Sequence, residues 1–220
     1  MKKGKLLSLL LAAVVGAGSL AMTAQAAPAE LPAQTAKTAA FVKASDWVLK
    51  DDWAIFALGR NQEEGCEKLY EDYYQGVLAL LADPAKLIPS DYIRLSLSLT
   101  AIGIDPRNIE GNDLLEKIDQ ADREMYFKMS TSSLAYALAL MERYPDSFSG
   151  TLKEDTIQKI LGAQQADGSF DYTVGGGYPD PDSTAQAMQG LMLLGDTYAS
   201  EIQAAVDWLN AQMNEDGAIL

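Results

Sequence analysis

The sequence contains no histidine and only one cysteine among its 220 residues. The missing histidine excludes Ser-His-Asp and Cys-His catalysis, histidine-ligated zinc and acid–base chemistry by imidazole. The single cysteine, Cys66, excludes an intramolecular disulfide and a cysteine-cluster zinc site. Any catalysis has to rest on carboxylates, tyrosines or hydroxyl groups, and we expect neither a cofactor nor a metal.

Basic residues are also scarce, with 17 Lys and Arg against 31 Asp and Glu, so the formal net charge is −14. This acidity argues against nucleic acid and against anionic membrane surfaces as partners. Hydrophobic residues make up 48% of the chain, which is enough to bury a core. We therefore expect a folded protein.

The N-terminal segment has the pattern of a secretory signal peptide. Three lysines precede the apolar run 6–15, and small residues fill the expected cleavage positions before residue 27. We expect residues 1–26 to be removed and the protein to be exported, to the extracellular space or the cell surface. The apolar run is too short for a membrane span, so we expect no stable membrane insertion after signal removal. Residues 27–36 have the composition of a mobile linker.

Beyond residue 36 the hydrophobic pattern is helical almost throughout, which predicts an all-α protein. Proline and glycine residues that break helices fall between the periodic segments. The expected helices are Lys37–Lys50, Trp53–Arg60, Glu67–Leu81, Asp91–Ile102, Leu114–Ala121, Ser132–Arg143, Glu154–Gln164, Ser183–Leu194 and Ser200–Met213.

The expected helices alternate between two kinds. Residues 132–140 and 184–191 are small and apolar on almost every face, so their helices must be buried on most sides. The helices over 154–164 and 200–213 are amphipathic and charged. The apolar helices recur roughly every 40–50 residues, which is typical of stacked helical hairpins. Their small residues would let the inner helix axes approach closely.

Two junctions between hairpins share a more specific sequence, at residues 161–170 and 209–218. In each, an outer helix is expected to end in glutamine, and an Asp-Gly turn reverses the chain. The glycine can take the left-handed conformation that closes a helix. The aspartate can accept backbone N–H bonds within the turn, and the glutamine can reach unpaired carbonyls.

These turns resemble the Gln-x-x-Asp-Gly repeats of the squalene-cyclase and protein-prenyltransferase superfamily, whose fold is an α/α toroid of six helical hairpins. The chain is most similar to exported bacterial prenyltransferase-like proteins related to the helical domain of transcobalamin and intrinsic factor, through residues 91–108, 112–117 and 164–191. The resemblance implies an incomplete toroid over residues 37–220, with about four and a half of the six hairpins. The missing hairpins would come from downstream sequence, if the domain is truncated at its C-terminus, or from another chain.

The resemblance offers one catalytic candidate. In class II terpene cyclases an Asp-x-Asp-Asp run supplies the proton that starts cyclisation, and by position this acid would be Asp182, with Asp180 beside it. Ser183 stands where the third aspartate would be, so part of the carboxylate cluster is missing. The structural alternative is that Asp182 caps the helix expected to begin at Ser183, while Asp180 favours its positive end. Prenylation, the zinc-dependent chemistry of the superfamily, needs a histidine ligand and is excluded.

Binding without chemistry is the function that we expect. The N-terminal ends of inner helices in such a toroid direct N–H groups and side chains towards a central cavity. The resemblance to transcobalamin suggests a corrinoid, and a peptide or glycan of the cell surface is equally compatible. For each aromatic residue, packing in the core is the alternative. The candidate ligand-binding residues are Trp53, Tyr92, Arg94, Tyr126, Tyr178 and Asp182.

Overall fold

The computed structural model describes residues 31–215, and helices are the regular secondary structure of this range, as the sequence predicts. The expected signal peptide and the second Asp-Gly turn, at Asp216-Gly217, lie outside the described residues. The α-helices are α2 (Leu31–Lys43), α3 (Asp52–Arg60), α4 (Glu67–Leu81), α5 (Pro89–Ala101), α6 (Leu114–Asp119), α7 (Arg123–Phe127), α8 (Thr131–Arg143), α9 (Leu152–Leu161), α10 (Pro181–Met192) and α11 (Ala199–Gln212). The short 3-10 helices are η1 (Val48–Lys50), η2 (Pro84–Lys86), η3 (Pro145–Ser147) and η4 (Gly195–Tyr198).

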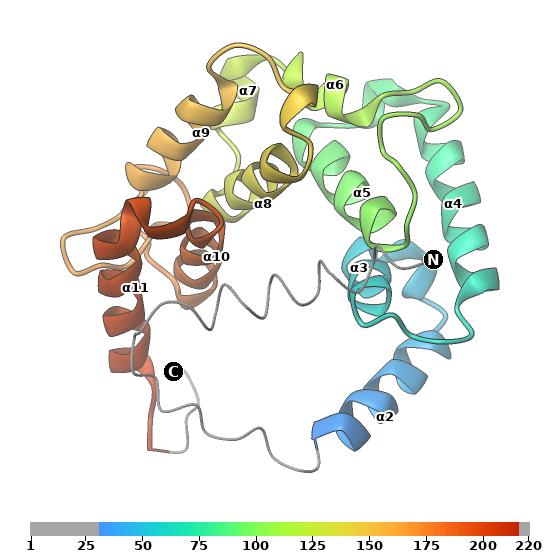
Figure 1. Ribbon diagram of the computed structural model, residues 1–220, viewed down its shortest axis with the longest axis horizontal. Helices are drawn as coiled ribbons and strands as arrows, with labels where there is room; N and C mark the ends of the chain where they lie inside the picture. Colours follow the sequence, from blue (N-terminus) through green and yellow to red (C-terminus); the bar gives the residue numbers. More distant parts are fainter. Residues whose placement is uncertain (1–30, 216–220) are drawn as a thin grey trace.

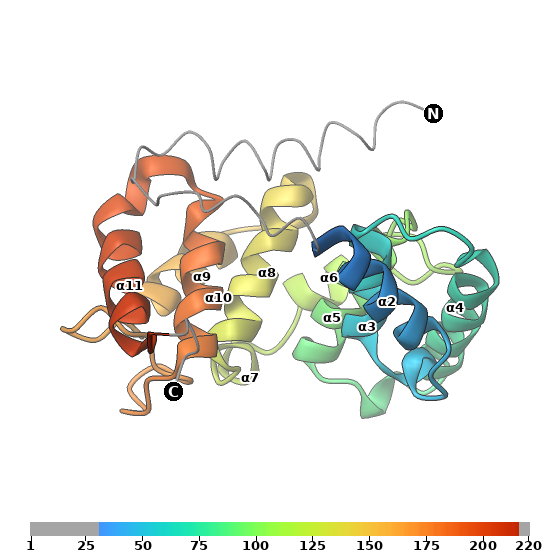
Figure 2. The same ribbon diagram turned by 90° about the horizontal axis from the view of Figure 1, so that it is seen from below.

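The helices form an open arc with an inner and an outer row (Figure 1). The inner row contains α3, α5, α8 and α10, which pack against one another in chain order. The outer row contains α4, α6, α7, α9 and α11, with α6 packed on α5, α9 on α8 and α11 on α10. Seen from below, α10 and α11 lie at one end of the arc, and α2, α3 and α4 lie at the other (Figure 2).

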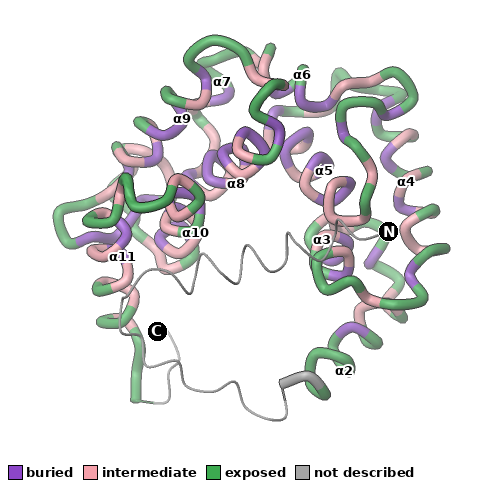
Figure 3. The backbone as a smooth tube through the Cα atoms, viewed as in Figure 1, coloured by how far each residue is buried: buried purple, intermediate pink, exposed green. Residues whose placement is uncertain are grey.

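The hydrophobic core follows the inner row. Ile55 of α3, Leu99 of α5, Leu138 of α8 and Leu191 of α10 are all fully buried. Buried residues run along several sides of α5 and α8, whereas exposed residues gather on the outer helices and the loops (Figure 3). The helices that are apolar on almost every face are therefore buried on most sides, as their composition predicts.

The inner helices begin at residues suited to a helix N-terminus. Asp51, Ser130 and Asp180 accept backbone N–H bonds in the first turns of α3, α8 and α10. Helix α5 begins with Pro89, at a position where the missing N–H of proline is not needed. These local signals fix where each inner helix starts.

The N-terminal helix differs from the expectation. Helix α2 begins at Leu31, so that residues 31–36, expected as linker, are helical. The helix stops before Ser45, whose hydroxyl donates to the carbonyl of Phe41 and so competes with helix continuation. The separate 3-10 helix η1 then covers the segment up to Lys50, where the sequence predicts one continuous helix.

Two further differences follow from local chemistry. Helix α10 begins at Pro181, two residues before the expected start at Ser183, because proline is well suited to the first turn. Helix α7 is not predicted at all, because its five residues are too few for a periodic pattern. The carboxylate of Asp122 caps this short helix by accepting the N–H of Met125.

The Asp-Gly turn after α9 has the conformation that its sequence predicts. Gly168 has a φ of +94°, and the Asp167 carboxylate accepts the N–H of Ser169 at 3.1 Å. The expected helix end is wrong, however, because α9 stops at Leu161 and Gln164 lies in the turn. The glycine therefore closes a tight hairpin turn rather than the helix itself.

This turn packs directly on the next outer helix, α11. The side-chain amide of Gln164 donates to the carbonyl of Glu201, at 2.9 Å. A Cβ atom on Gly168 would lie only 2.3 Å from the carbonyl oxygen of Ala204. The motif therefore joins successive outer helices, which explains why it needs glutamine and glycine together.

Small residues also bring the inner helices together. A Cβ atom on Gly59 of α3 would lie 2.8 Å from the backbone carbonyl of Ala101, at the end of α5. A Cβ atom on Gly190 of α10 would lie 3.0 Å from the Cβ of Ala135 in α8. At these two contacts the glycine lies directly against the neighbouring backbone or against an alanine methyl group, as the small inner residues predict.

We expect the Gly59→Ala substitution to lower the free energy of unfolding by about 1–3 kcal/mol, because overpacking against a backbone outweighs the better helix propensity of alanine. The matched control is Gly76→Ala in α4, where nothing lies within 4 Å of the added Cβ. There the propensity gain of about 0.5–1 kcal/mol should appear alone. Urea denaturation measures both, and stabilisation by both substitutions would contradict the close approach.

Candidate functional site

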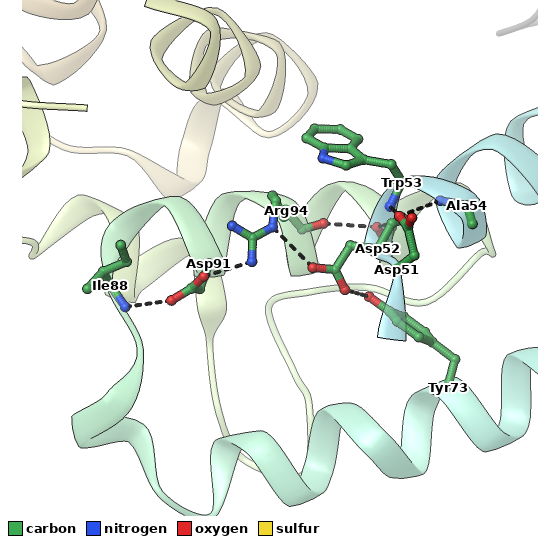
Figure 4. A network of polar contacts seen from close by, with 9 residues as sticks. Asp51, Asp52, Trp53, Ala54, Tyr73, Ile88, Asp91 and Arg94 are labelled. Carbon is green, nitrogen blue, oxygen red and sulfur yellow. Dashed lines mark hydrogen bonds and ion pairs between the residues drawn. The ribbon is translucent and has the colours of Figure 1, made fainter. Parts of the chain in front are cut away.

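Arg94, in the first half of α5, is held between two carboxylates (Figure 4). Its Nε atom lies 3.2 Å from Oδ2 of Asp52, and its Nη2 atom lies 2.8 Å from Oδ1 of Asp91. The other oxygen of Asp91 accepts the N–H of Ile88, just before α5. Burial lowers the pKa of Arg94, but hydrogen bonding and charge from Asp52 and Asp91 raise it above its usual value. The guanidinium is therefore charged and fixed in orientation.

Asp52, in the first turn of α3, connects three helices. Its carboxylate accepts a 2.7 Å hydrogen bond from the hydroxyl of Tyr73 in α4, in addition to the bond from Arg94. Its backbone carbonyl accepts the hydroxyl of Ser98 in α5, also at 2.7 Å. Burial, reinforced by the charge of Asp52, raises the pKa of Tyr73 well above its usual value. Tyr73 therefore stays protonated and keeps donating to Asp52.

An aromatic pair lies beside this network. The ring of Trp53 in α3 is 4.6 Å from the ring of Tyr136 in α8, between centroids, with the planes tilted by 46°. Trp53 is still 37% exposed. Burial, together with the charge of Asp182 in α10, raises the pKa of Tyr136. Aromatic side chains of α3 and α8 therefore meet here, and the charge of Asp182 in α10 acts on one of them.

The structure brings together some of the predicted binding residues. Trp53 directly follows Asp52 in α3, and Arg94 binds the carboxylate of Asp52 (Figure 4). The charge of Asp182 acts on Tyr136, the ring partner of Trp53. These residues form the candidate site.

The three predicted tyrosines have other surroundings. Tyr92 is 8% exposed, and Tyr126 is completely buried, with its hydroxyl 3.1 Å from that of Thr156 in α9. Both positions fit the alternative of core packing. Tyr178 is 78% exposed, in the hairpin that precedes α10.

The two aspartates of the cyclase-like motif have different surroundings. The Asp180 carboxylate accepts the N–H of Ser183 at 2.8 Å and is the N-cap of α10. The expected cap at Asp182 is wrong, because the helix begins earlier and places Asp182 inside its first turn. The Asp182 side chain is exposed, where its charge favours the positive end of the helix.

Sequence reasoning missed three residues of the site, namely Asp52, Asp91 and Tyr136. Tyr136 lies in a stretch that is apolar on almost every face, where core packing was the stronger interpretation of an aromatic residue. Asp52 and Asp91 lie in the first turns of their helices, where an acidic residue is expected for the helix dipole alone. Their pairing with Arg94 depends on the tertiary contact between α3 and α5.

Within residues 31–215, no group of three or more acidic or cysteine side chains is arranged to hold a metal ion. Over the same range, no helix combines the length and the apolar character needed to cross a membrane. Comparisons of the chain with protein-family models, curated proteins and solved structures gave no match. The geometry of the site is thus the basis for a functional proposal.

We expect Asp52→Ala to lower the free energy of unfolding by about 2–3 kcal/mol, since it leaves the buried Tyr73 hydroxyl without its acceptor and removes one partner of Arg94. Asp182→Ala is the matched control, because Asp182 also lies in a first turn but is exposed. It should cost at most about 1 kcal/mol through the helix dipole. If urea denaturation shows the same loss of unfolding free energy for both variants, Asp52 acts only through the dipole of its helix end.

The burial of Tyr126 predicts a loss of stability at alkaline pH. Burial raises the pKa of Tyr126 to about 12, although the Thr156 hydroxyl acts in the opposite direction. An unfolded tyrosine has a pKa of about 10, so the folded state binds more protons between these values and the free energy of unfolding falls as the pH rises.

In Tyr126→Phe this loss between about pH 10 and 12 should be smaller than in the wild type, because phenylalanine has no proton to release. Urea denaturation at several alkaline pH values measures the slope. Tyr178→Phe, at an exposed position, should keep the slope of the wild type. The same slope for wild type and Tyr126→Phe would argue against the buried position.

Proposed function

We propose that the protein is a non-enzymatic binding module whose ligand lies against Trp53 and Tyr136. The observation that carries this proposal is the pair of rings from two different helices, 4.6 Å apart, one of them still 37% exposed. A large aromatic side chain that is half covered offers apolar area at a small cost in conformational freedom, which is typical of binding sites.

Arg94 supplies the polar part of the proposed site. Asp52 and Asp91 occupy its Nε and Nη2 atoms, and the side chain is 37% exposed. The remaining N–H groups of the planar guanidinium can donate to a ligand, and the two ion pairs reduce the entropy lost on binding. The site suits a flat, amphipathic molecule that stacks on the rings and accepts hydrogen bonds at one edge. A corrinoid has this character, and a glycan or peptide of the cell surface is the alternative.

The surroundings of Asp180 and Asp182 support binding over terpene cyclisation. A cyclase acid acts inside a cavity closed to water, where burial keeps one carboxyl protonated. Asp182 is exposed, and the carboxylate of Asp180 is used as a helix cap. No specific feature of these two residues favours the role of Asp182 as a proton donor.

We also propose that the arc is part of an α/α toroid of the squalene-cyclase and prenyltransferase type. Its support is the alternation of inner and outer helices, together with an Asp-Gly turn that packs on the following outer helix. The signal-like sequence of residues 1–26 supports export, which would place the site outside the cell.

Thermal denaturation with a corrinoid tests the nature of the ligand. A ligand that binds only the folded state stabilises it by about 2.7 kcal/mol when present at 100 times its Kd, so the Tm should rise with ligand concentration. A parallel titration uses a soluble cell-surface oligosaccharide. An unchanged Tm with both probes would contradict the proposal of a small-molecule site.

Substitutions then test the position of the site with whichever probe binds. Trp53→Ala and Tyr136→Ala should each raise the Kd about tenfold or more, because removal of a central aromatic anchor costs about 2 kcal/mol. Trp47→Ala is the control, since Trp47 is 44% exposed and, within residues 31–215, makes no ring contact with Trp53 or Tyr136. Calorimetric titration should show the wild-type Kd for this control. An unchanged Kd for both site variants would place the ligand elsewhere.

A further inference from the structure

A separate cavity of about 280 Å³ lies at the opposite ends of the inner helices, where α5 and α8 finish. Its lining comes from the last turns of these helices and from the segments that follow them. Thr100 and Arg143 mark the two helix ends. The cavity is therefore distinct from the site of Trp53 and Arg94, which lies in the first halves of the inner helices.

Tyr144 forms a rigid wall of this cavity. The residue is only 8% exposed, and its hydroxyl lies 3.0 Å from that of Thr100. The guanidinium groups of Arg107 and Arg143 lie 5.2 Å and 5.0 Å from the centre of its ring, within the range of cation–π attraction. Two positive groups thus lie beside one tyrosine.

The two arginines differ in their partners. Arg107 is paired with Asp105 through three hydrogen bonds of 2.6–3.1 Å, so its charge is compensated. Arg143 makes no ion pair with any residue in the range 31–215. The same holds for Asp146, which also lines the cavity. Arg143 does act on the cavity's Asp105, whose pKa its charge helps to lower, but without a direct ion pair. The cavity therefore presents one exposed cation and one exposed anion that stand outside any ion pair of the described residues.

The helix ends decide which ligand charge is acceptable. The C-terminal ends of α5 and α8 each carry about half a negative charge, which opposes a purely anionic ligand. Arg143 opposes a purely cationic one. A zwitterion satisfies both, with its carboxylate at the guanidinium and its ammonium group at the carboxylate and the helix ends. The volume is near the lower limit for ligand pockets, so it suits a molecule much smaller than a corrinoid.

We propose that this cavity binds a zwitterionic molecule of the α-amino acid class, with the ligand carboxylate on Arg143 and the ligand ammonium group on Asp146. The proposal is independent of the function proposed for the Trp53 site, because no residue is shared between the two.

Equilibrium dialysis of the full chain against radiolabelled L-alanine, L-leucine and L-glutamine tests this proposal. We expect at least one of the three to bind. Arg143→Gln and Asp146→Asn should each weaken that binding about tenfold or more, because each removes a charged hydrogen-bond partner. Arg123→Gln, at an exposed arginine of α7, is the matched control and should leave the affinity unchanged. Thermal denaturation checks that all three variants remain folded.

Acetate and methylamine, which carry only one of the two charges, should compete at least tenfold more weakly than the amino acid. Absence of binding for all three amino acids would overturn the proposal. Binding that neither Arg143→Gln nor Asp146→Asn weakens would overturn it as well. If acetate competes as strongly as the amino acid itself and Asp146→Asn leaves the affinity unchanged, the cavity is a simple anion site and the proposal is overturned.

Discussion

The close approach of the inner helices is the constraint on which the rest of the structure depends. At Gly59 and Gly190 a neighbouring helix lies where a side chain would otherwise be. Because helices in such contact have little freedom to slide, the first turns of α3 and α10 are fixed relative to α5 and α8. Trp53 can then reach Tyr136 past the intervening α5. The candidate site is thus a consequence of glycine and alanine in the inner row rather than of any feature of the site itself.

Asp52 links this packing to the polar part of the site. It binds Tyr73 of the outer row and Arg94 of the inner row with the two oxygens of one carboxylate. An ion pair of this kind adds little net stability, since desolvation offsets much of the attraction, but breaking it leaves buried groups unpaired. Its main effect is to hold the guanidinium of Arg94 in one orientation. Figure 4 shows the guanidinium directed towards the carboxylates of Asp52 and Asp91.

The sequence predicts the helices of this protein better than their ends or their contacts. The inner helices follow from their apolar composition, and the Asp-Gly turn follows from the conformational freedom of Gly168. The start of α10 was missed because Pro181 looks like a helix breaker, although it suits a first turn. The pairing of Arg94 with Asp52 could not be predicted from the sequence, because the residues are 42 positions apart and meet only through the contact of α3 with α5. Trp53 was found from its place at a helix start, whereas its partner Tyr136 had no local signal stronger than core packing.

The local charges at the candidate site say more about the charge of a suitable ligand than the net charge of the whole chain does. Five carboxylates lie on the first turns of the inner helices or directly before them. The single guanidinium of Arg94, in the second turn of α5, leaves an excess of negative charge. The four helix N-termini, with about half a positive charge each, offset only about half of that excess. A neutral or cationic ligand is therefore favoured over an anionic one, and stacking on Trp53 has to supply most of the affinity. The carboxylates are Asp51, Asp52, Asp91, Asp180 and Asp182.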